Sequence, residues 1–276
     1  MTLNEQIAAH YRHGDLLQAI EDGLSNLGLG PNRVTVDDLG PVDEFHIGGR
    51  VASTHFLDQL DINAGMTVLD VGCGLGGGAR FAAATYEAQV TGIDLTPEYV
   101  ETGQVLCDWV GLSDRVSLRQ GSALSMPFPD REFQRAYMMH VGMNIDAKEA
   151  LFAEVHRVLD SGARFGIYDI MRTGEGDLAY PVPWAGSRDT SWLTGPEGYR
   201  KALEAAGFEC LTENNRGAFA LDFFRKIREA NATRGGPPPL GLHTLMQHST
   251  AEKVGNMEAN IAAGLIAPVE MIAVKT

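Results

Sequence analysis

The chain has 276 residues, of which 44% are hydrophobic and 21% are charged. These proportions are typical of a folded globular protein, and they argue against disorder, collagen-like repeats and coiled coil. Lys and Arg number 22 and Asp and Glu 36, which gives a net charge of −14 at pH 7. An acidic chain of this kind can hardly assemble the basic face that nucleic-acid binding needs, so we expect no nucleic-acid partner.

The three cysteines, Cys73, Cys107 and Cys210, form no CxxC pair and show no zinc-like spacing. The sequence therefore predicts neither a disulfide framework nor a metal site. No apolar run approaches the roughly 18 residues that suggest a membrane span, and the N-terminus lacks a basic segment followed by a hydrophobic one. We expect a cytoplasmic protein without a membrane partner, and homo-oligomerisation is left open.

The N-terminal part of the chain is predicted to be helical. Apolar residues at intervals of three and four from Leu3 to Leu27 indicate two short amphipathic helices, separated near Gly14. The segment 28–32 ends the second helix, because Gly supplies a C-cap and Pro cannot continue the hydrogen-bond ladder. A linker up to Gly49 and a helix over 51–60 are expected next.

From Thr67 onward, predicted strands and helices alternate. Such alternation implies right-handed crossovers and a mostly parallel sheet that is covered by helices on both faces. The predicted strands are 67–71, 89–94, 116–120, 133–140, 164–170, 208–212 and 269–274, and the predicted helices are 80–86, 97–110, 147–159 and 195–206.

Two long segments, Arg172 to Thr194 and Ala218 to Leu265, interrupt this alternation. The first carries Trp184 and Trp192 among Gly and Pro residues. The second holds two predicted helices, 219–232 and 250–263, on either side of a Gly- and Pro-rich break. Both segments exceed the usual connection length, and insertions of that length in α/β domains are usually lids or substrate-binding elements.

The turn after the first predicted strand is rich in glycine. Gly72, Gly74 and Gly77 have GxGxxG spacing between a strand and a helix, which fits a dinucleotide site or an adenosyl site without a phosphate. Asp70 favours the adenosyl site, because a carboxylate attracts a cationic ammonium or sulfonium and repels a pyrophosphate. Capping of the following turn is the alternative role for Asp70.

Two further segments lie at the same predicted sheet edge. Asp94 ends the second strand, and the carboxyl edge of a parallel sheet is where ligands are contacted. Its carboxylate can accept both hydroxyls of an adenosine ribose, or it can cap the helix that begins near Thr96. The segment 121–123 follows the third strand, where a side chain or a backbone amide can meet an adenine.

Three segments, 70–76, 92–94 and 121–128, together resemble the first three motifs of the class I S-adenosylmethionine-dependent methyltransferases. The segment 159–164 resembles that family's turn before the fifth strand, with Ser161 in the place of the usual proline and Ala163 in that of the second glycine. The resemblance covers Asp61 to Lys275. It implies a Rossmann-like seven-stranded mixed sheet of order 3-2-1-4-5-7-6, in which 269–274 is the inserted antiparallel strand.

The resemblance also implies S-adenosylmethionine as the cofactor, with S-adenosylhomocysteine as the product. Gly72, Gly74 and Gly76 would lie against the methionine part of the cofactor, Asp70 near its ammonium and Asp94 on its ribose. Ser122 stands where the family usually carries Asp, which shifts the expected adenine contact toward the Ala123 backbone. The remaining cofactor-binding candidates are Leu95, Ser122, Ala123, His140 and Tyr11.

The segments 11–20 and 45–50 are similar to the N-terminal region of small-molecule methyltransferases such as the sarcosine and dimethylglycine N-methyltransferases. This likeness implies an N-terminal helical cover, 1–60, over a methyltransferase core, 61–276, with cover insertions at about 172–194 and 218–265. Two histidines, His140 and His46, are catalytic candidates. His140 is the candidate general base, because an unperturbed imidazole is mostly neutral at pH 7. The substrate-binding candidates are Tyr11, His46, His140, Trp184, Trp192 and Phe219.

The expected activity is transfer of a methyl group from S-adenosylmethionine to a small-molecule acceptor, by N- or O-methylation of an amine or a natural-product-like compound. One alternative is a scaffold that binds S-adenosylmethionine but catalyses a non-methylating reaction or serves as a partner subunit. Another is an NAD-dependent dehydrogenase, which Asp70 and the terminal strand disfavour.

Overall fold

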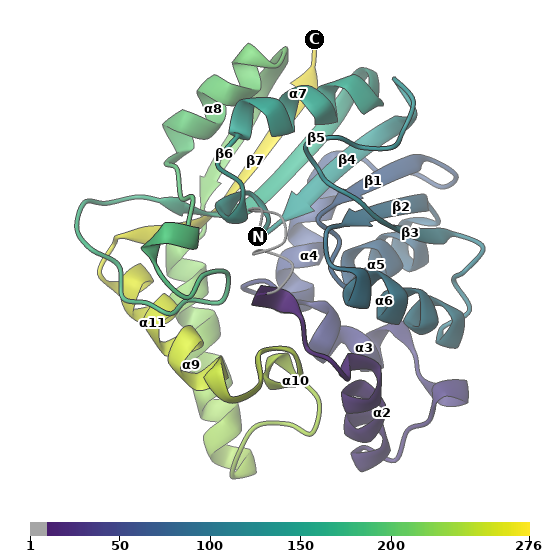
Figure 1. Cartoon of the computed structure of the whole chain (residues 1–276), viewed down its shortest axis with the longest axis vertical. Helices are drawn as coiled ribbons and strands as arrows, with labels where there is room; N and C mark the ends of the chain where they lie inside the picture. The colour runs from purple at the N-terminus through teal and green to yellow at the C-terminus, as the bar shows by residue number, and fades with distance from the viewer. Residues whose placement is uncertain (1–9) are drawn as a thin grey trace.

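The structure is a computed structural model that describes residues 10–276 (Figure 1). It contains a seven-stranded sheet with the order β3-β2-β1-β4-β5-β7-β6. Strand β7 is antiparallel to β5 and β6, and the other neighbouring strands are parallel. The predicted sheet is therefore confirmed, including the antiparallel inserted strand. The strands are β1 (Thr67–Val71), β2 (Gln89–Asp94), β3 (Val116–Gln120), β4 (Phe133–Met139), β5 (Leu159–Arg172), β6 (Phe208–Asn215) and β7 (Ile266–Lys275).

Helices cover both faces of this sheet. Successive side chains of a strand point to opposite faces, so Leu69 packs in one apolar cluster and its neighbour Val68 in another. The cluster of Leu69 includes side chains from α7 (Lys148–Val158) and α8 (Pro196–Ala205). The cluster of Val68 includes side chains from α4 (Gly49–Leu57), α5 (Gly77–Tyr86) and α6 (Pro97–Trp109).

A further group of helices occupies the lower half of Figure 1, away from α7 and α8 at the top. Helix α10 contacts α2, α3 and α11, and helix α9 contacts α11 and β7. The N-terminal helices and the second long insertion therefore meet one another on this side of the molecule. The group consists of α2 (Leu16–Asn26), α3 (Val36–Asp43), α9 (Gly217–Arg234), α10 (Leu242–Met246) and α11 (Thr250–Ala262).

Apart from shifts of a few residues at the ends of several elements, the main differences from the sequence prediction concern α3, α10 and β5. The expected linker before Gly49 contains α3, whose start carries a capping box between Thr35 and Asp38 and which includes Pro41. Helix α10 was not predicted. Strand β5 begins at Leu159 rather than Arg164. The first predicted N-terminal helix lies largely outside the described residues.

Within residues 10–276, none of the helices has the combination of length and hydrophobicity that crossing a bilayer requires.

Candidate active site

A cavity of about 1250 Å³ lies between the glycine turn and helices α9, α10 and α11. Pockets that hold one drug-sized ligand usually measure roughly 300–1,000 Å³, so this cavity has room for two molecules side by side. One part of its wall, which we name the cofactor end, consists of Asp70, Gly72, Gly74, Asp94, Leu95, Ser122 and Ala123. The other part, which we name the acceptor end, is formed by Phe45, Trp184 and residues of α9, α10 and α11.

The glycine turn is held by Asp94. One carboxylate oxygen of Asp94 accepts from the backbone N–H of Gly74 at 2.9 Å, and the other accepts from Thr96 at 2.8 Å. Gly74 has a φ of +53°, and a Cβ built there would meet only Tyr99 Cδ2, at 3.8 Å. The positive φ thus requires glycine at this position, and Gly74 itself forms part of the cavity wall. Each Asp94 oxygen keeps a further lone pair for a ligand hydroxyl.

Gly76 does not line the cavity, although it was predicted to contact the cofactor. A Cβ at this position would lie 2.7 Å from Leu118 Cδ1 and 3.4 Å from an Arg80 nitrogen. Glycine is needed here because neighbouring side chains fill the space and because φ is +77° at the residue that precedes α5. Its role is therefore to let the turn enter the helix.

Asp70 is a buried carboxyl group on the cavity wall. The Tyr137 hydroxyl donates to its Oδ2 at 3.1 Å, and no Lys or Arg of the described residues forms an ion pair with it. Burial raises the pKa of Asp70 to about 7, with the Tyr137 hydrogen bond acting in the opposite direction. A buried carboxyl without a protein cation is suited to receive a cationic group.

His140 lines the cavity and has a buried ring nitrogen without a hydrogen-bond partner. Its backbone is left-handed, with φ +57°, and its ring packs with the rings of His46 and Tyr168, at centroid distances of 6.0 and 5.2 Å. Its Nε2 makes no hydrogen bond within the described residues. Burial, with a smaller effect from His46, holds the pKa of His140 well below the usual value, so the imidazole is neutral.

The loop that carries His140 is positioned by Asp169, a residue that the sequence analysis missed. The two oxygens of Asp169 accept from the backbone N–H groups of Val141 and Gly142, each at 2.8 Å, and from the Tyr199 hydroxyl at 2.8 Å. Burial raises the pKa of Asp169 to about 6. An aspartate within the otherwise apolar run 167–171 was a signal that could have identified it.

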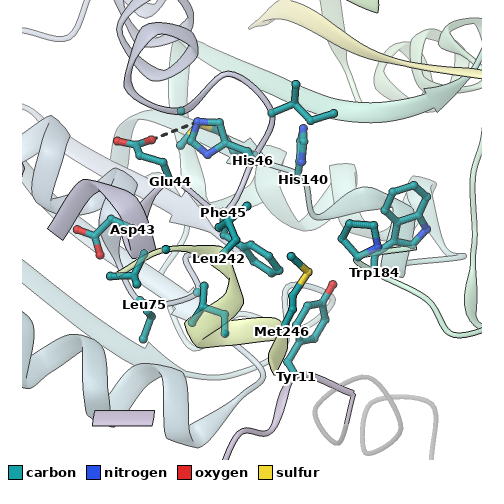
Figure 2. Close-up of a pocket in the computed structure, with 18 of the residues that line it drawn as sticks. Tyr11, Asp43, Glu44, Phe45, His46, Leu75, His140, Trp184, Leu242 and Met246 are labelled. Carbon is teal, nitrogen blue, oxygen red and sulfur yellow. Dashed lines mark ion pairs between the residues drawn. The ribbon is translucent and has the colours of Figure 1, made fainter. Parts of the chain in front are cut away.

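His46 lines the cavity, but its Nε2 is already engaged (Figure 2). This nitrogen lies 3.0 Å from Ser53 Oγ and 3.2 Å from Glu44 Oε2, and Glu44 Oε1 lies 3.1 Å from an Arg50 nitrogen. Burial lowers the pKa of His46. Because Glu44 and Ser53 already contact His46 Nε2, His140 is the one of the two histidines whose Nε2 has no hydrogen-bond partner among the described residues.

Tyr11 lies on the cavity wall and links the N-terminal segment to the loop after β4. Its hydroxyl donates to Asn144 Oδ1 at 3.2 Å, and its ring packs against Phe45 and Tyr99. The neighbouring His10 forms a hydrogen bond with the Pro183 carbonyl at 3.1 Å. The described N-terminal residues thereby touch both the β4 loop and the first long insertion.

Three predicted aromatic substrate residues have different positions. Trp184 lines the cavity, is 3% exposed and donates from Nε1 to Ser191 Oγ at 2.9 Å. Trp192 is 36% exposed and does not line the cavity. Phe219 does not line it either, since its ring packs beneath the Arg216 guanidinium at 4.4 Å. Of these three aromatic residues, Trp184 therefore lies on the cavity wall, and Trp192 and Phe219 do not.

Comparisons with known proteins agree with this geometry. A family model described as a methyltransferase domain matches residues 68–162. A sterol 24-C-methyltransferase of Gibberella zeae is 37% identical over 120 residues, which cover 43% of this chain and 32% of that enzyme. A protein of Oryza sativa subsp. japonica, provisionally named a tocopherol O-methyltransferase, is 44% identical over 98 residues, which cover 36% of this chain and 27% of that protein. The chain thus matches about a third of the length of these curated relatives.

The fold comparison covers more of the chain. A solved structure from Galdieria sulphuraria, provisionally described as a sarcosine dimethylglycine methyltransferase, has a TM-score of 0.67 at 19% identity and covers 81% of this chain and 84% of that one. The domain model and the relatives agree in sequence over the first part of the sheet, and the solved structure agrees in fold. Residues 68–162 match a methyltransferase domain, and the chain is similar to the class I S-adenosylmethionine-dependent methyltransferases.

The cofactor end fits the cofactor of this methyltransferase family. Gly74 has no side chain where a ligand approaches, Asp94 has free lone pairs above the turn, and Asp70 offers a buried carboxyl to a cation. Ser122 and Ala123 line the same end. The Ser122 hydroxyl accepts from the Leu124 N–H at 3.2 Å and keeps its proton for a ligand acceptor.

Proposed function

We propose that the protein binds S-adenosylmethionine at the cofactor end and transfers its methyl group to a small molecule at the acceptor end. The observation that carries this proposal is one continuous cavity with the Asp94-held glycine turn at one end and the unpartnered His140 nitrogen on its wall. The relatives are named for methylation of sterol carbon and tocopherol oxygen, and the structural neighbour for methylation of amines. They support methyl transfer in general and leave the methylated atom open.

The bound cofactor would supply an activated methyl group on a sulfonium sulfur. Asp70, Asp94 and the Gly74 turn would hold this donor, so that the acceptor atom would bond to the methyl carbon as the carbon–sulfur bond breaks and leaves its electron pair on sulfur. Positioning and exclusion of water can provide much of the acceleration in such a displacement. Where the acceptor atom carries a proton, the neutral Nε2 of His140 receives it. Asp169 acts as a positioning residue, because it holds the backbone of the His140 loop.

We extend the proposal to a mobile cover. The described N-terminal residues 10–57 and the insertions 172–194 and 218–265 contribute Tyr11, Phe45, Trp184, Met246 and other residues to the cavity wall. Closure of these segments over both ligands would exclude water from the sulfonium.

Cytoplasmic location and homo-oligomerisation stay predictions from the sequence.

Calorimetry with S-adenosylmethionine and, separately, with NAD tests the first half of the proposal. We expect binding of S-adenosylmethionine and none of NAD. Incubation with methyl-labelled cofactor and a panel of amines, hydroxyl compounds, thiols and carboxylates then tests transfer. Cofactor binding without label transfer to any acceptor would instead favour the non-methylating scaffold or the partner subunit.

The Asp94→Ala variant should bind S-adenosylmethionine about tenfold to a hundredfold more weakly. The substitution removes charge-assisted acceptors worth about 1.5–3 kcal/mol and also releases the Gly74 N–H. Isothermal titration measures the loss. Asp94→Asn keeps one acceptor oxygen and should fall between the wild type and Asp94→Ala, whereas equal affinity in all three proteins would refute the ribose assignment.

The affinity for S-adenosylmethionine should rise from pH 6 to pH 8 and then level off. Burial raises the pKa of Asp70 to about 7 in the folded protein, above the value near 3.9 of an unfolded aspartate. Below pH 7 the carboxyl is therefore mostly protonated, and binding of a cation requires loss of that proton. Titrations across this range should show the rise in wild type and a flat profile in Asp70→Asn. A rise that persists in the variant would assign it to another group, such as Asp169.

A further inference from the structure

The acceptor end of the cavity is walled mainly by large apolar side chains from separate parts of the chain. Phe45 follows α3, Trp184 lies in the first insertion, and Phe224, Leu242, Met246 and Met257 come from α9, α10 and α11. Figure 2 shows Leu242 and Met246 beside Phe45 and Tyr11, with Trp184 and His140 across the same space. A ligand held here contacts mostly carbon and sulfur.

The cations on the cavity wall are already satisfied or lie outside its buried part. Among residues 10–276, the Lys and Arg residues that line the cavity are Arg50, Arg228 and Arg234. Arg50 pairs with Glu44, Arg228 pairs with Glu258, and Arg234 is exposed. A carboxylate on the acceptor would therefore enter this space without a buried counter-ion, which costs more free energy than apolar contacts return.

A cationic acceptor meets a similar difficulty. The buried carboxylates near the acceptor end, Asp43 and Glu44, already pair with Arg80 and Arg50, and Asp70 and Asp94 stand at the cofactor end. Among the described residues that line the cavity, the buried side-chain atoms without a hydrogen bond are Glu44 Oε1, Arg50 Nη1 and His140 Nε2. The first two lie 3.1 Å from each other as an ion pair, which leaves the neutral His140 Nε2. It can exchange one hydrogen bond with an uncharged group such as a hydroxyl.

We propose that the acceptor is a predominantly apolar molecule that presents one uncharged polar group to His140, and that zwitterionic amino acids such as sarcosine are not accepted. This inference rests on the proposed function, because it assigns the substrate class of the same cavity. It differs from the amine substrates that the sequence resemblance implies, since the described acceptor end lacks the buried, unpaired charges that a zwitterion needs. Shape and apolar contact then determine selectivity at this end.

Binding to the protein saturated with S-adenosylhomocysteine tests the inference without requiring turnover. Calorimetric titrations would use farnesol and 2-naphthol as apolar hydroxyl probes and sarcosine as the zwitterionic probe. We expect at least one apolar probe to bind, and we expect sarcosine to give no heat of binding at about a hundredfold higher concentration. A hundredfold difference in affinity between the two probes is readily measured by calorimetry. Tighter binding of sarcosine, or binding of no apolar probe, overturns the inference.

Variants of the apolar wall make the test specific. Met246→Glu introduces a charge among apolar side chains and should abolish binding of the apolar probe, and Met246→Ala, which removes buried methylene groups, should weaken it about tenfold or more. Trp184→Ala and Trp192→Ala form a matched pair, because Trp184 lines the cavity and Trp192 does not. Only Trp184→Ala should weaken probe binding, and equal losses in both variants would overturn the inference.

The two proposals fail in different ways. If the wild type does not bind S-adenosylhomocysteine, the proposed function itself is wrong. A different result would show that only the acceptor class is wrong. In that case wild type, Met246→Ala and Trp184→Ala all bind S-adenosylhomocysteine normally, and their affinities for the apolar probes are equal. Retained affinity for S-adenosylhomocysteine also shows that each variant is folded.

Discussion

Replacing Gly74 by valine should reduce the affinity for S-adenosylmethionine by at least about a hundredfold, or roughly 2.8 kcal/mol, while leaving most of the fold intact. The valine side chain would project from the turn toward the cavity, where the nearest protein atom to its Cβ is Tyr99 Cδ2 at 3.8 Å. The protein can therefore accommodate the Cβ, but a ligand that approaches the turn backbone cannot. Isothermal titration gives the affinity, and thermal unfolding gives the stability.

The chain offers a matched control for this variant. Gly65 also has a positive φ, +77°, and has no atom within 4 Å of a built Cβ. Valine at either position strains the backbone by about 1–2 kcal/mol, but Gly65 is not on the cavity wall. If Gly74→Val and Gly65→Val bind S-adenosylmethionine equally well, the turn has only a structural role.

The second large effect should come from the Asp43→Ala variant, which we expect to lose about 3–5 kcal/mol of unfolding free energy. Asp43 and Arg80 form an ion pair in which both side chains are fully buried, at 2.5 Å between the closest atoms. Removal of Asp43 leaves the buried guanidinium without its counter-ion. This loss is a large part of the roughly 5–15 kcal/mol that stabilises an ordinary domain. Urea denaturation measures it.

The same pair connects the N-terminal cover to the glycine turn. Arg80 also donates to the carbonyls of Leu75 and Gly103, at 2.7 and 3.0 Å. The double variant Asp43→Leu/Arg80→Met removes both charges and should recover part of the stability that Asp43→Ala loses. Glu197→Ala, which breaks an exposed pair with Arg200, should change stability little. A similarly small change in Asp43→Ala would show that the Asp43–Arg80 pair is not desolvated.

Much of the fold was predictable from the sequence because its strands and helices follow simple periodic patterns. The apolar run at 67–71 and the helix after Thr96 appear where expected. Helix α3 was missed because Gly40 and Pro41 suggested a linker, although the capping box at Thr35 and Asp38 indicated a helix start. Helix α10 has five residues after a proline-rich break, which is too short for a periodic pattern.

The cofactor end was more predictable than the acceptor end. Asp94 follows a strand directly, and its position at the sheet edge follows from the parallel topology. Asp169 was missed, because its partners Val141, Gly142 and Tyr199 are brought close only by tertiary folding. Glu44 was missed although its partners His46, Arg50 and Ser53 are near in sequence. Trp192 and Phe219 were assigned to the substrate site from aromatic content alone, and composition does not determine which way a side chain of an irregular segment or cover helix points.

The two ends of the cavity are encoded by different stretches of the chain. Asp70, Asp94 and Ser122 lie within residues 68–162, which the methyltransferase domain model matches, whereas Trp184 and helices α9 to α11 lie outside it. Because these stretches contribute to separate parts of the wall, mutations at Trp184 or in α9, α10 and α11 can alter the shape offered to an acceptor without changing the turn that receives the cofactor. Substrate preference can therefore diverge between duplicated genes while the methyl donor stays the same. A copy that acquires a new acceptor keeps the cofactor-binding part of the cavity and changes only the acceptor end.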